Sequence, residues 1–371
     1  MRVLLVQLAS TGDCLFVTAI ARQIKEVDYP NCQLTWLIGS AYRNVIANNP
    51  YVDEVIEIPL TSRAEIPSQR ERIEEHIAKA TKSRQFDRVF ITDYTGTNAH
   101  NWFGTTRSSL FRSYPHRLRV GVDPVICLTQ SEVERVRRFA EKHSLGGNEC
   151  TILFECSPLS SQSDMTLQRA YQISEEVVRR FPAVKVVLSS GSSIVPGHPN
   201  IVDGSQITWR ENAELTKYCH LLVGCSSGIS WLNTSTWGAR LPMVQSIDPQ
   251  YYGTRVTASM EIDLMYFGVG SSDIIEMANA TNDEMIGCIS VIVDRGFAYA
   301  KAKYSMRHSA YYGGRLFLAD VLKNGCYRRG NLPNLRLLFF LVSCDLRAAL
   351  KRNDFMGRLY RRGKGVCAYL R

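Results

Sequence analysis

Short apolar runs alternate with helical patterns along the first 150 residues. Apolar runs predict strands over residues 3–8, 34–38, 52–58, 88–92 and 118–122. Apolar positions at helical spacing predict helices over residues 14–27, 42–47, 69–82 and 131–143. Largely apolar strands separated by helices are typical of βαβ units around a parallel sheet.

A second alternation of the same kind begins near Cys150. Its predicted strands are 151–155, 184–189, 221–224 and 243–246, and its predicted helices are 167–180, 212–218, 228–237 and 272–295. The polar, glycine-containing turn 143–149 separates the two halves. We therefore predict an α/β protein with two Rossmann-like, doubly wound domains, residues 1–145 and 150–300. Two such domains in tandem face a central cleft at the carboxyl ends of their strands.

Several motif classes are missing from this framework. Neither half has G-x-G-x-x-G after a strand, and the chain has no G-x-x-x-x-G-K-[ST]. This disfavours a dinucleotide-dependent enzyme and a P-loop enzyme. The eleven cysteines are irregularly spaced without a C-x-x-C pair, which disfavours a zinc site and indicates reduced thiols in a cytoplasm. We expect neither a metal nor another cofactor.

The positive charge is concentrated at the C-terminal end. Residues 301–371 hold 16 Lys/Arg and 3 Asp/Glu, whereas residues 1–300 hold 28 and 32. Within this basic tail, residues 334–365 can form an amphipathic helix with too short an apolar run to span a bilayer. Such a helix is able to lie on an anionic membrane surface. The alternative is a terminal helix that packs back across both domains. No nucleic-acid-binding motif accompanies the charge, so we expect no nucleic-acid partner.

The first strand is followed by Gly12 and Asp13, in the stretch "ASTGDCLF". Aspartate is favoured at helix starts, where it accepts hydrogen bonds from free backbone N–H groups. A plain helix cap is therefore one interpretation of Asp13. The other is a general base at the mouth of the cleft, ionised near the positive end of the helix dipole.

The segment "RVLLVQLASTGDCLFVTAIARQIKEVDYPNCQLTWLIGSAYRNVIANNPYVDEVI" resembles the N-terminal part of glycosyltransferase family 9, which includes the lipopolysaccharide heptosyltransferases. The shared features are Gly12-Asp13 after a first strand, a strand with Trp36, and "NPYVDEVI" at residues 49–56. The resemblance implies the GT-B fold, an N-terminal acceptor domain and a C-terminal donor domain. It also implies that Asp13 is the catalytic base of an inverting sugar transfer.

A second motif, "LLVGCSSGISWLNTSTWGARLPMV", continues the resemblance at residues 221–244. A helix start after a strand binds anions, and the diphosphate of a nucleotide sugar suits Ser226, Ser227 and Gly228. The resemblance matches Ser227 and Gly228, but Ser226 replaces the family's acid and Trp231 replaces its histidine. An ordinary serine cap is the alternative. The same residues spell G-x-S-x-G, but a serine hydrolase needs a later histidine, and only His308 follows.

Further candidates lie in loops that follow predicted strands. The loop "FECSPLSSQSDMTLQRAYQI" lacks the phosphate-binding lysine of the resembled family and has Ser163 in that region. Arg169 or Arg210 could supply the missing cation, but nothing in the sequence selects between them. We assign Ser157 and Gly191 to the donor, and Thr11, Gly12, Asn98 and His100 to the acceptor. Arg107 is a further acceptor candidate, and Trp209 is a candidate for packing on a base. Each of these has an ordinary loop or core interpretation beside it.

Together these features predict an inverting, metal-independent glycosyltransferase. It would move a sugar from a nucleotide-diphosphate sugar to a hydroxyl of a glycan or lipid-linked acceptor, as in lipopolysaccharide biosynthesis. We expect a peripheral location on the cytoplasmic face of the cell membrane. Two alternatives stay open: a catalytically inactive sugar-nucleotide binding protein of GT-B shape, and a sugar-nucleotide epimerase.

Overall fold

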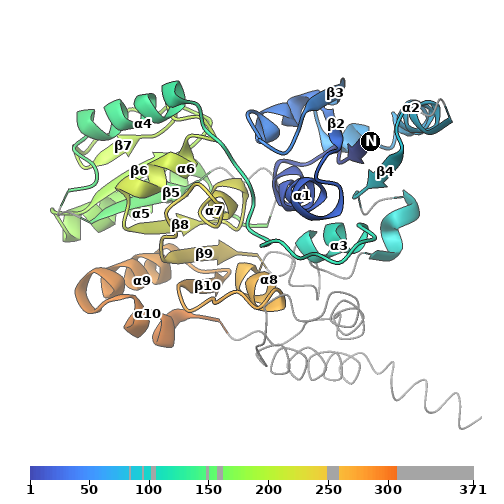
Figure 1. Cartoon of the computed structure of the whole chain (residues 1–371). Helices are drawn as coiled ribbons and strands as arrows, with labels where there is room; N and C mark the ends of the chain where they lie inside the picture. The colour runs from blue at the N-terminus through green and yellow to red at the C-terminus, as the bar shows by residue number, and fades with distance from the viewer. Residues whose placement is uncertain are drawn as a thin grey trace, which may run out of the picture.

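Two parallel β-sheets with helices packed on them form the framework of the protein (Figure 1). The computed structural model describes residues 1–82, 85–93, 96–101, 106–147, 150–156, 162–248 and 259–306. The α/β class and the two-sheet organisation predicted from the sequence are confirmed. The basic tail lies outside the described residues from residue 307 onward.

The first sheet has four parallel strands in the order β3-β2-β1-β4. These strands are β1 (Arg2–Val6), β2 (Gln33–Gly39), β3 (Glu54–Ile58) and β4 (Arg88–Ile91). The helices of this part are α1 (Thr11–Gln23), with its continuation η1 (Ile24–Asp28), η2 (Ser40–Ile46), η3 (Arg63–Glu65), α2 (Arg70–Lys82), η4 (Gly96–Asn101) and α3 (Thr106–Arg112). We call this sheet and its helices unit 1.

The second sheet has six parallel strands in the order β10-β9-β8-β5-β6-β7. Its strands are β5 (Thr151–Glu155), β6 (Lys185–Ser189), β7 (Ile201–Asp203), β8 (Leu221–Gly224), β9 (Met243–Ile247) and β10 (Ile274–Ala278). Its helices are α4 (Gln130–Lys142), α5 (Leu167–Arg180), α6 (Asn212–Leu215), η5 (Thr216–Tyr218), α7 (Gly228–Leu232), α8 (Met260–Tyr266), α9 (Asn282–Arg295) and α10 (Phe297–Tyr304). We call this part unit 2. Counted from β5, the strands follow the 3-2-1-4-5-6 order of a dinucleotide-binding fold, and the order reverses between β5 and β8.

Three predicted elements differ from the structure. Residues 118–122 form no strand, because the side-chain oxygen of Gln23 accepts the backbone N–H groups of Arg119 and Val120. The predicted helix 272–295 is strand β10 followed by α9, whose start is fixed by a capping box between Thr281 and Glu284. The predicted helix 228–237 ends at Leu232.

Helix α4 packs on unit 2, although the sequence analysis placed it in the first domain (Figure 1). It contacts α6, and Arg135 of α4 forms an ion pair with Glu211 at 2.7 Å. At its C-terminal end, Lys185 of β6 donates to the carbonyls of His143 and Ser144. The chain therefore crosses between the units before α4 rather than at the turn 143–149.

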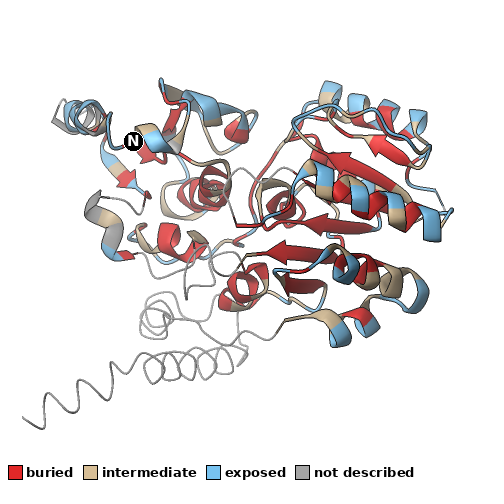
Figure 2. Ribbon diagram, turned by 180° about the vertical axis from the view of Figure 1, so that it is seen from behind, coloured by how far each residue is buried: buried red, intermediate tan, exposed pale blue. Residues whose placement is uncertain are grey.

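One part of the hydrophobic core of unit 1 continues into unit 2, whereas a separate cluster lies within unit 1 alone. One cluster of buried side chains joins the α1 side of the first sheet to the α6–α8 side of the second, whereas α5 and α9 enclose a separate cluster on the opposite face. The second sheet is buried on both faces (Figure 2), as expected for a doubly wound sheet. Among the described residues, no helix is both long and apolar enough to cross a membrane.

Arg210 of unit 2 reaches across to unit 1. Its guanidinium donates to the carbonyls of Asn44 at 2.7 Å and Ala47 at 2.9 Å, which end η2, and to the carbonyl of Cys127. It also forms an ion pair with Glu132 at 2.9 Å. This buried side chain is therefore used to join the two units and the crossover segment, rather than to bind a phosphate.

We expect Arg210→Ala to lower the free energy of unfolding by about 3 kcal/mol, because it removes a buried donor from three carbonyls and leaves Glu132 without its ion-pair partner. Urea denaturation followed by circular dichroism measures this change. As a control, Arg138→Ala removes an arginine whose side chain is 75% exposed, and it should change stability by less than about 0.5 kcal/mol. Equal effects of the two variants would contradict the role of Arg210.

Candidate functional site

Asp13 lies in the first turn of α1, which follows the carboxyl end of β1 after a loop of residues 7–10. Strand β1 is paired with β2 on one side and with β4 on the other, and the order of the first sheet reverses between β1 and β4. The carboxyl edge beside such a reversal is where open α/β sheets bind ligands. The side chain of Asp13 is largely buried, with 5% of the residue exposed.

The proposed acceptor residues lie at this same edge of the first sheet. Thr11 and Gly12 are half-buried in the first turn of α1, and no atom lies within 4 Å of the position that a Cβ on Gly12 would take. Asn98 and His100 belong to η4, which follows the neighbouring strand β4. Asn98 donates to the carbonyl of Ile91 at 3.0 Å, and His100 is exposed.

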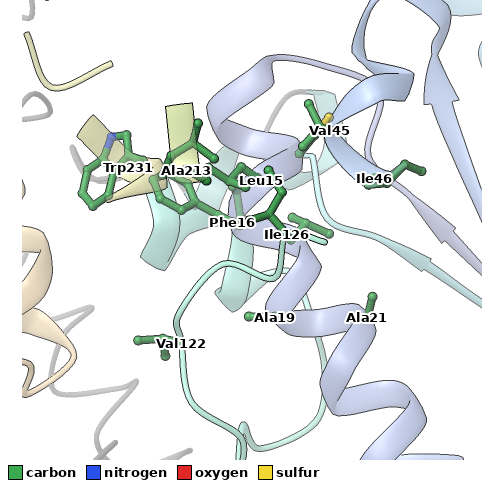
Figure 3. Close-up of a cluster of buried hydrophobic side chains, with 14 of the residues drawn as sticks. Leu15, Phe16, Ala19, Ala21, Val45, Ile46, Val122, Ile126, Ala213 and Trp231 are labelled. Atoms are coloured by element: carbon green, nitrogen blue, oxygen red, sulfur yellow. The ribbon is translucent and has the colours of Figure 1, made fainter. Parts of the chain in front are cut away.

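One turn after Asp13, α1 meets unit 2 through an aromatic contact. The rings of Phe16 and Trp231 pack edge to face with centroids 4.8 Å apart, and Figure 3 shows both in one buried cluster. Trp231 comes from α7, and α1 and α7 are in contact. At the level of Phe16 the two units are therefore in direct contact through bulky side chains.

The start of α7 is occupied by a carboxylate of the protein itself. Oε1 of Glu155, the last residue of β5, accepts the backbone N–H of Ile229 at 2.9 Å and the hydroxyl of Ser227. Oε2 accepts the backbone N–H of Cys225 at 3.2 Å and the hydroxyl of Ser230 at 2.5 Å. Of the three residues predicted to bind a diphosphate, Ser227 therefore gives its hydroxyl to Glu155, and Ser226 gives its backbone N–H to Gln245.

Glu155 belongs to a buried row of polar side chains across the second sheet. The strand register places it beside Ser189, and places Gly224 beside Gln245 and Gln245 beside Glu276. Oε1 of Gln245 accepts from the backbone N–H of Ser226 at 2.6 Å, and Glu276 accepts from the start of α8. A charged or amide residue inside otherwise apolar strands, "TILFE" and "MVQSI", is the sequence signal that predicts such a row.

Packing and backbone conformation explain why Gly224 and Ser226 stand before α7. A Cβ on Gly224 would lie 2.2 Å from the hydroxyl oxygen of Ser230, so the polar row leaves no room for a side chain there. Ser226 has a φ of +54°, a left-handed conformation that costs free energy in a non-glycine residue. Gln162 donates to its carbonyl at 3.0 Å, which holds this turn. His308, the partner required for a hydrolase, lies outside the described residues.

Of the other donor candidates, Trp209 is brought against the start of α7. Ser157 lies outside the described residues, and Gly191 is exposed in the loop after β6. Ser163 is buried and accepts the backbone N–H of Met165. Arg169 donates to Asn282, Asp164 and Ala280, so it is held inside unit 2. Trp209 packs against Gly228, where a Cβ would meet its indole nitrogen at 2.4 Å.

Arg107, expected in an acceptor loop, is instead buried between the units. It lies on α3, and its guanidinium contacts Asp263 of α8 at 3.1 Å. Burial raises the pKa of Asp263 to about 6, and the positive charge of Arg107 offsets part of this increase.

Burial, together with the charge of Glu155, raises the pKa of the Cys225 thiol, which disfavours a thiolate nucleophile at this edge. Among the described residues, no cluster of three or more potential metal ligands is present.

No protein-family model and no curated protein matches the chain. Among solved structures, the chain is similar to a family 9 glycosyl transferase from Veillonella parvula, with 14% identity, 91% of this chain and 97% of that chain covered, and a TM-score of 0.47. It is also similar to ADP-heptose lps heptosyltransferase II from E. coli, with 13% identity, 67% of this chain and 86% of that chain covered, and a TM-score of 0.46. A third similar structure is UDP-GlcNAc 2-epimerase from Neisseria meningitidis bound to UDP-GlcNAc, with 11% identity, 92% of this chain and 100% of that chain covered, and a TM-score of 0.47. At such identities and TM-scores, these likenesses do not define the reaction of this chain.

We expect Glu155→Gln to destabilise the protein by about 2 kcal/mol, because an amide offers one acceptor oxygen where four donors now share two. The midpoint of urea denaturation measures this loss. Glu141→Gln is the matched control, since the side chain of Glu141 is 59% exposed, and its midpoint should stay near that of the wild type. A Glu155→Gln variant as stable as the wild type would show that the carboxylate is not needed at the start of α7.

Proposed function

We propose that the protein is an inverting glycosyltransferase of GT-B type that moves a sugar from a nucleotide-diphosphate sugar to a hydroxyl of a glycan acceptor. The observation that carries the proposal is the position of Asp13, in the first turn of α1 at the carboxyl edge where the first sheet reverses its order. The resemblance of residues 2–56 to family 9 supports the same role for this residue.

In the proposed reaction, Asp13 accepts the proton of the acceptor hydroxyl as its oxygen attacks the anomeric carbon of the donor sugar. The bond from that carbon to the nucleoside diphosphate breaks, and the diphosphate leaves with the electron pair. Attack opposite the leaving group inverts the anomeric centre. Thr11 and Gly12 beside Asp13, and Asn98 and His100 after β4, are the proposed contacts of the acceptor.

The proposed donor position is the carboxyl edge of the second sheet between β5 and β8, where its strand order reverses. Ser157 after β5 and Gly191 after β6 remain the proposed contacts there. Backbone N–H groups and cations, rather than a metal ion, are proposed to stabilise the departing diphosphate, because preorganised donors act where charge develops.

One observation favours a second candidate function, a binding protein of the same shape that performs no transfer. Four donors around the start of α7 are taken by Glu155, so a diphosphate placed there would meet a negative charge. A protein with this arrangement binds the sugar or the nucleoside without activating the leaving group. Release of nucleoside diphosphate by the purified wild type in the presence of a nucleotide sugar and acceptor separates the two candidates.

We expect Asp13→Asn to lower kcat by about 10³-fold, since the amide cannot accept the proton. Donor affinity should change by less than about twofold, because the base contacts the acceptor rather than the donor. Transfer kinetics and isothermal titration with the donor found in a nucleotide-sugar panel measure both quantities. Asp294→Asn on the exposed face of α9 is the control, and an Asp13→Asn enzyme with full turnover would exclude the proposed base.

The basic tail is proposed to bring the enzyme to an anionic membrane that carries a lipid-linked acceptor. Each Lys or Arg near such a surface contributes about 1 kcal/mol. We expect the full chain to bind vesicles containing phosphatidylglycerol, and to bind neutral phosphatidylcholine vesicles at least about tenfold more weakly. Replacing Arg358, Arg361, Arg362 and Lys364 by Gln should remove this difference. Equal sedimentation of the wild type with both vesicle types would contradict the membrane role.

A further inference from the structure

A buried arginine of unit 1 is enclosed by aromatic rings from both units. The guanidinium carbon of Arg107 lies 4.6 Å from the ring centre of Phe16 on α1, 4.8 Å from that of Trp231 on α7 and 5.5 Å from that of Phe267, which follows α8. Only 1% of Arg107 is exposed. Cation–π contacts of this kind are stronger when water is excluded, and the flat guanidinium stacks on rings in a way that a lysine does not.

The charge of Arg107 is balanced across the same boundary. Its Nη2 lies 3.1 Å from Oδ2 of Asp263, without the alignment of a hydrogen bond, and its Nη1 donates to the carbonyl of Val122 at 3.3 Å. Asp123 and Arg240 are the other charged groups that act on it. A buried charge that loses its partner is strongly unfavourable, so unit 1 is held where Arg107 and Asp263 remain together.

This contact lies directly beside the proposed catalytic base. Asp13 and Phe16 are three residues apart on α1, so they lie on the same face of the helix. The ring of Phe16 is held between Arg107 and Trp231. This cluster therefore sets the position of that face of α1 relative to unit 2. It thereby also sets the direction from which the Asp13 side chain meets a donor held by unit 2.

We propose that Arg107 is a positioning residue: through Phe16, Trp231 and Asp263 it fixes the face of α1 that carries Asp13 against unit 2. The inference rests on the proposed function for its catalytic consequence, but its structural part is independent of any reaction. It assigns no contact with substrate to Arg107. It also explains why Trp231 stands where the resembled family has a histidine, since this tryptophan supplies one wall of the arginine's enclosure.

The experiment compares full-length Arg107→Ala, Arg107→Lys and Asp263→Asn with the wild type and with Arg119→Ala, which changes an exposed arginine of the crossover segment. Hydrogen exchange is measured on the amides of residues 11–23 and 260–266. We expect Arg107→Ala to accelerate exchange at both segments at least about tenfold. Arg107→Lys should restore little of the protection, because an ammonium does not stack between the rings. Arg119→Ala should exchange like the wild type.

Transfer kinetics per folded molecule provide the second readout, with the folded fraction taken from near-ultraviolet circular dichroism. For Arg107→Ala we expect kcat to fall at least about tenfold while the KM for the donor stays within about twofold. A purely structural role predicts an unchanged kcat per folded molecule, and that result overturns the proposal. Unchanged exchange at both segments also overturns it. If the wild type transfers no sugar from any donor, the proposed function fails, while accelerated exchange in Arg107→Ala still supports the structural part.

Discussion

The carboxylate of Glu155 is the contact on which the arrangement of the candidate site depends. It ends β5, the strand at which the second sheet reverses its order, and it binds the start of α7 through two backbone N–H groups and two serine hydroxyls. A buried carboxylate requires such donors, because an unpaired charge away from water is strongly unfavourable. The requirement fixes where α7 begins and therefore where Trp231 lies.

The consequences extend from α7 into unit 1. Trp231 meets Phe16, and both rings enclose Arg107, whose charge is balanced by Asp263. Arg210 makes a second connection through carbonyls at the end of η2. Side chains of both units thus fill the space between α1 and α7, and the hydrophobic core passes from one sheet to the other. A ligand of both units has to approach from the carboxyl edges of the strands.

The same carboxylate limits the chemistry of the second sheet. The resembled family has an acid in the loop before this helix, where the present chain has Ser226, and here the carboxylate comes from the neighbouring strand instead. The loop therefore keeps a negative charge while losing its own acidic residue. This is why the proposed donor position relies on the edge between β5 and β8 as a whole, and not on the serines of the loop. Asp13, in contrast, lies at the carboxyl edge of the first sheet, where the sequence predicted it.

The sequence by itself determined the two α/β halves, because apolar strands and amphipathic helices are local patterns that each segment carries. It also placed Asp13 near the start of the first helix, although the structure caps that helix with Ser10 and makes Asp13 its third residue. Only the tertiary structure decided that α4 packs on unit 2, that Glu155 reaches α7 and that Arg107 lies between the units. Each of these contacts joins residues about 70 or more positions apart. Their partners are chosen by strand order and by the need to pair buried charge, which no local pattern contains.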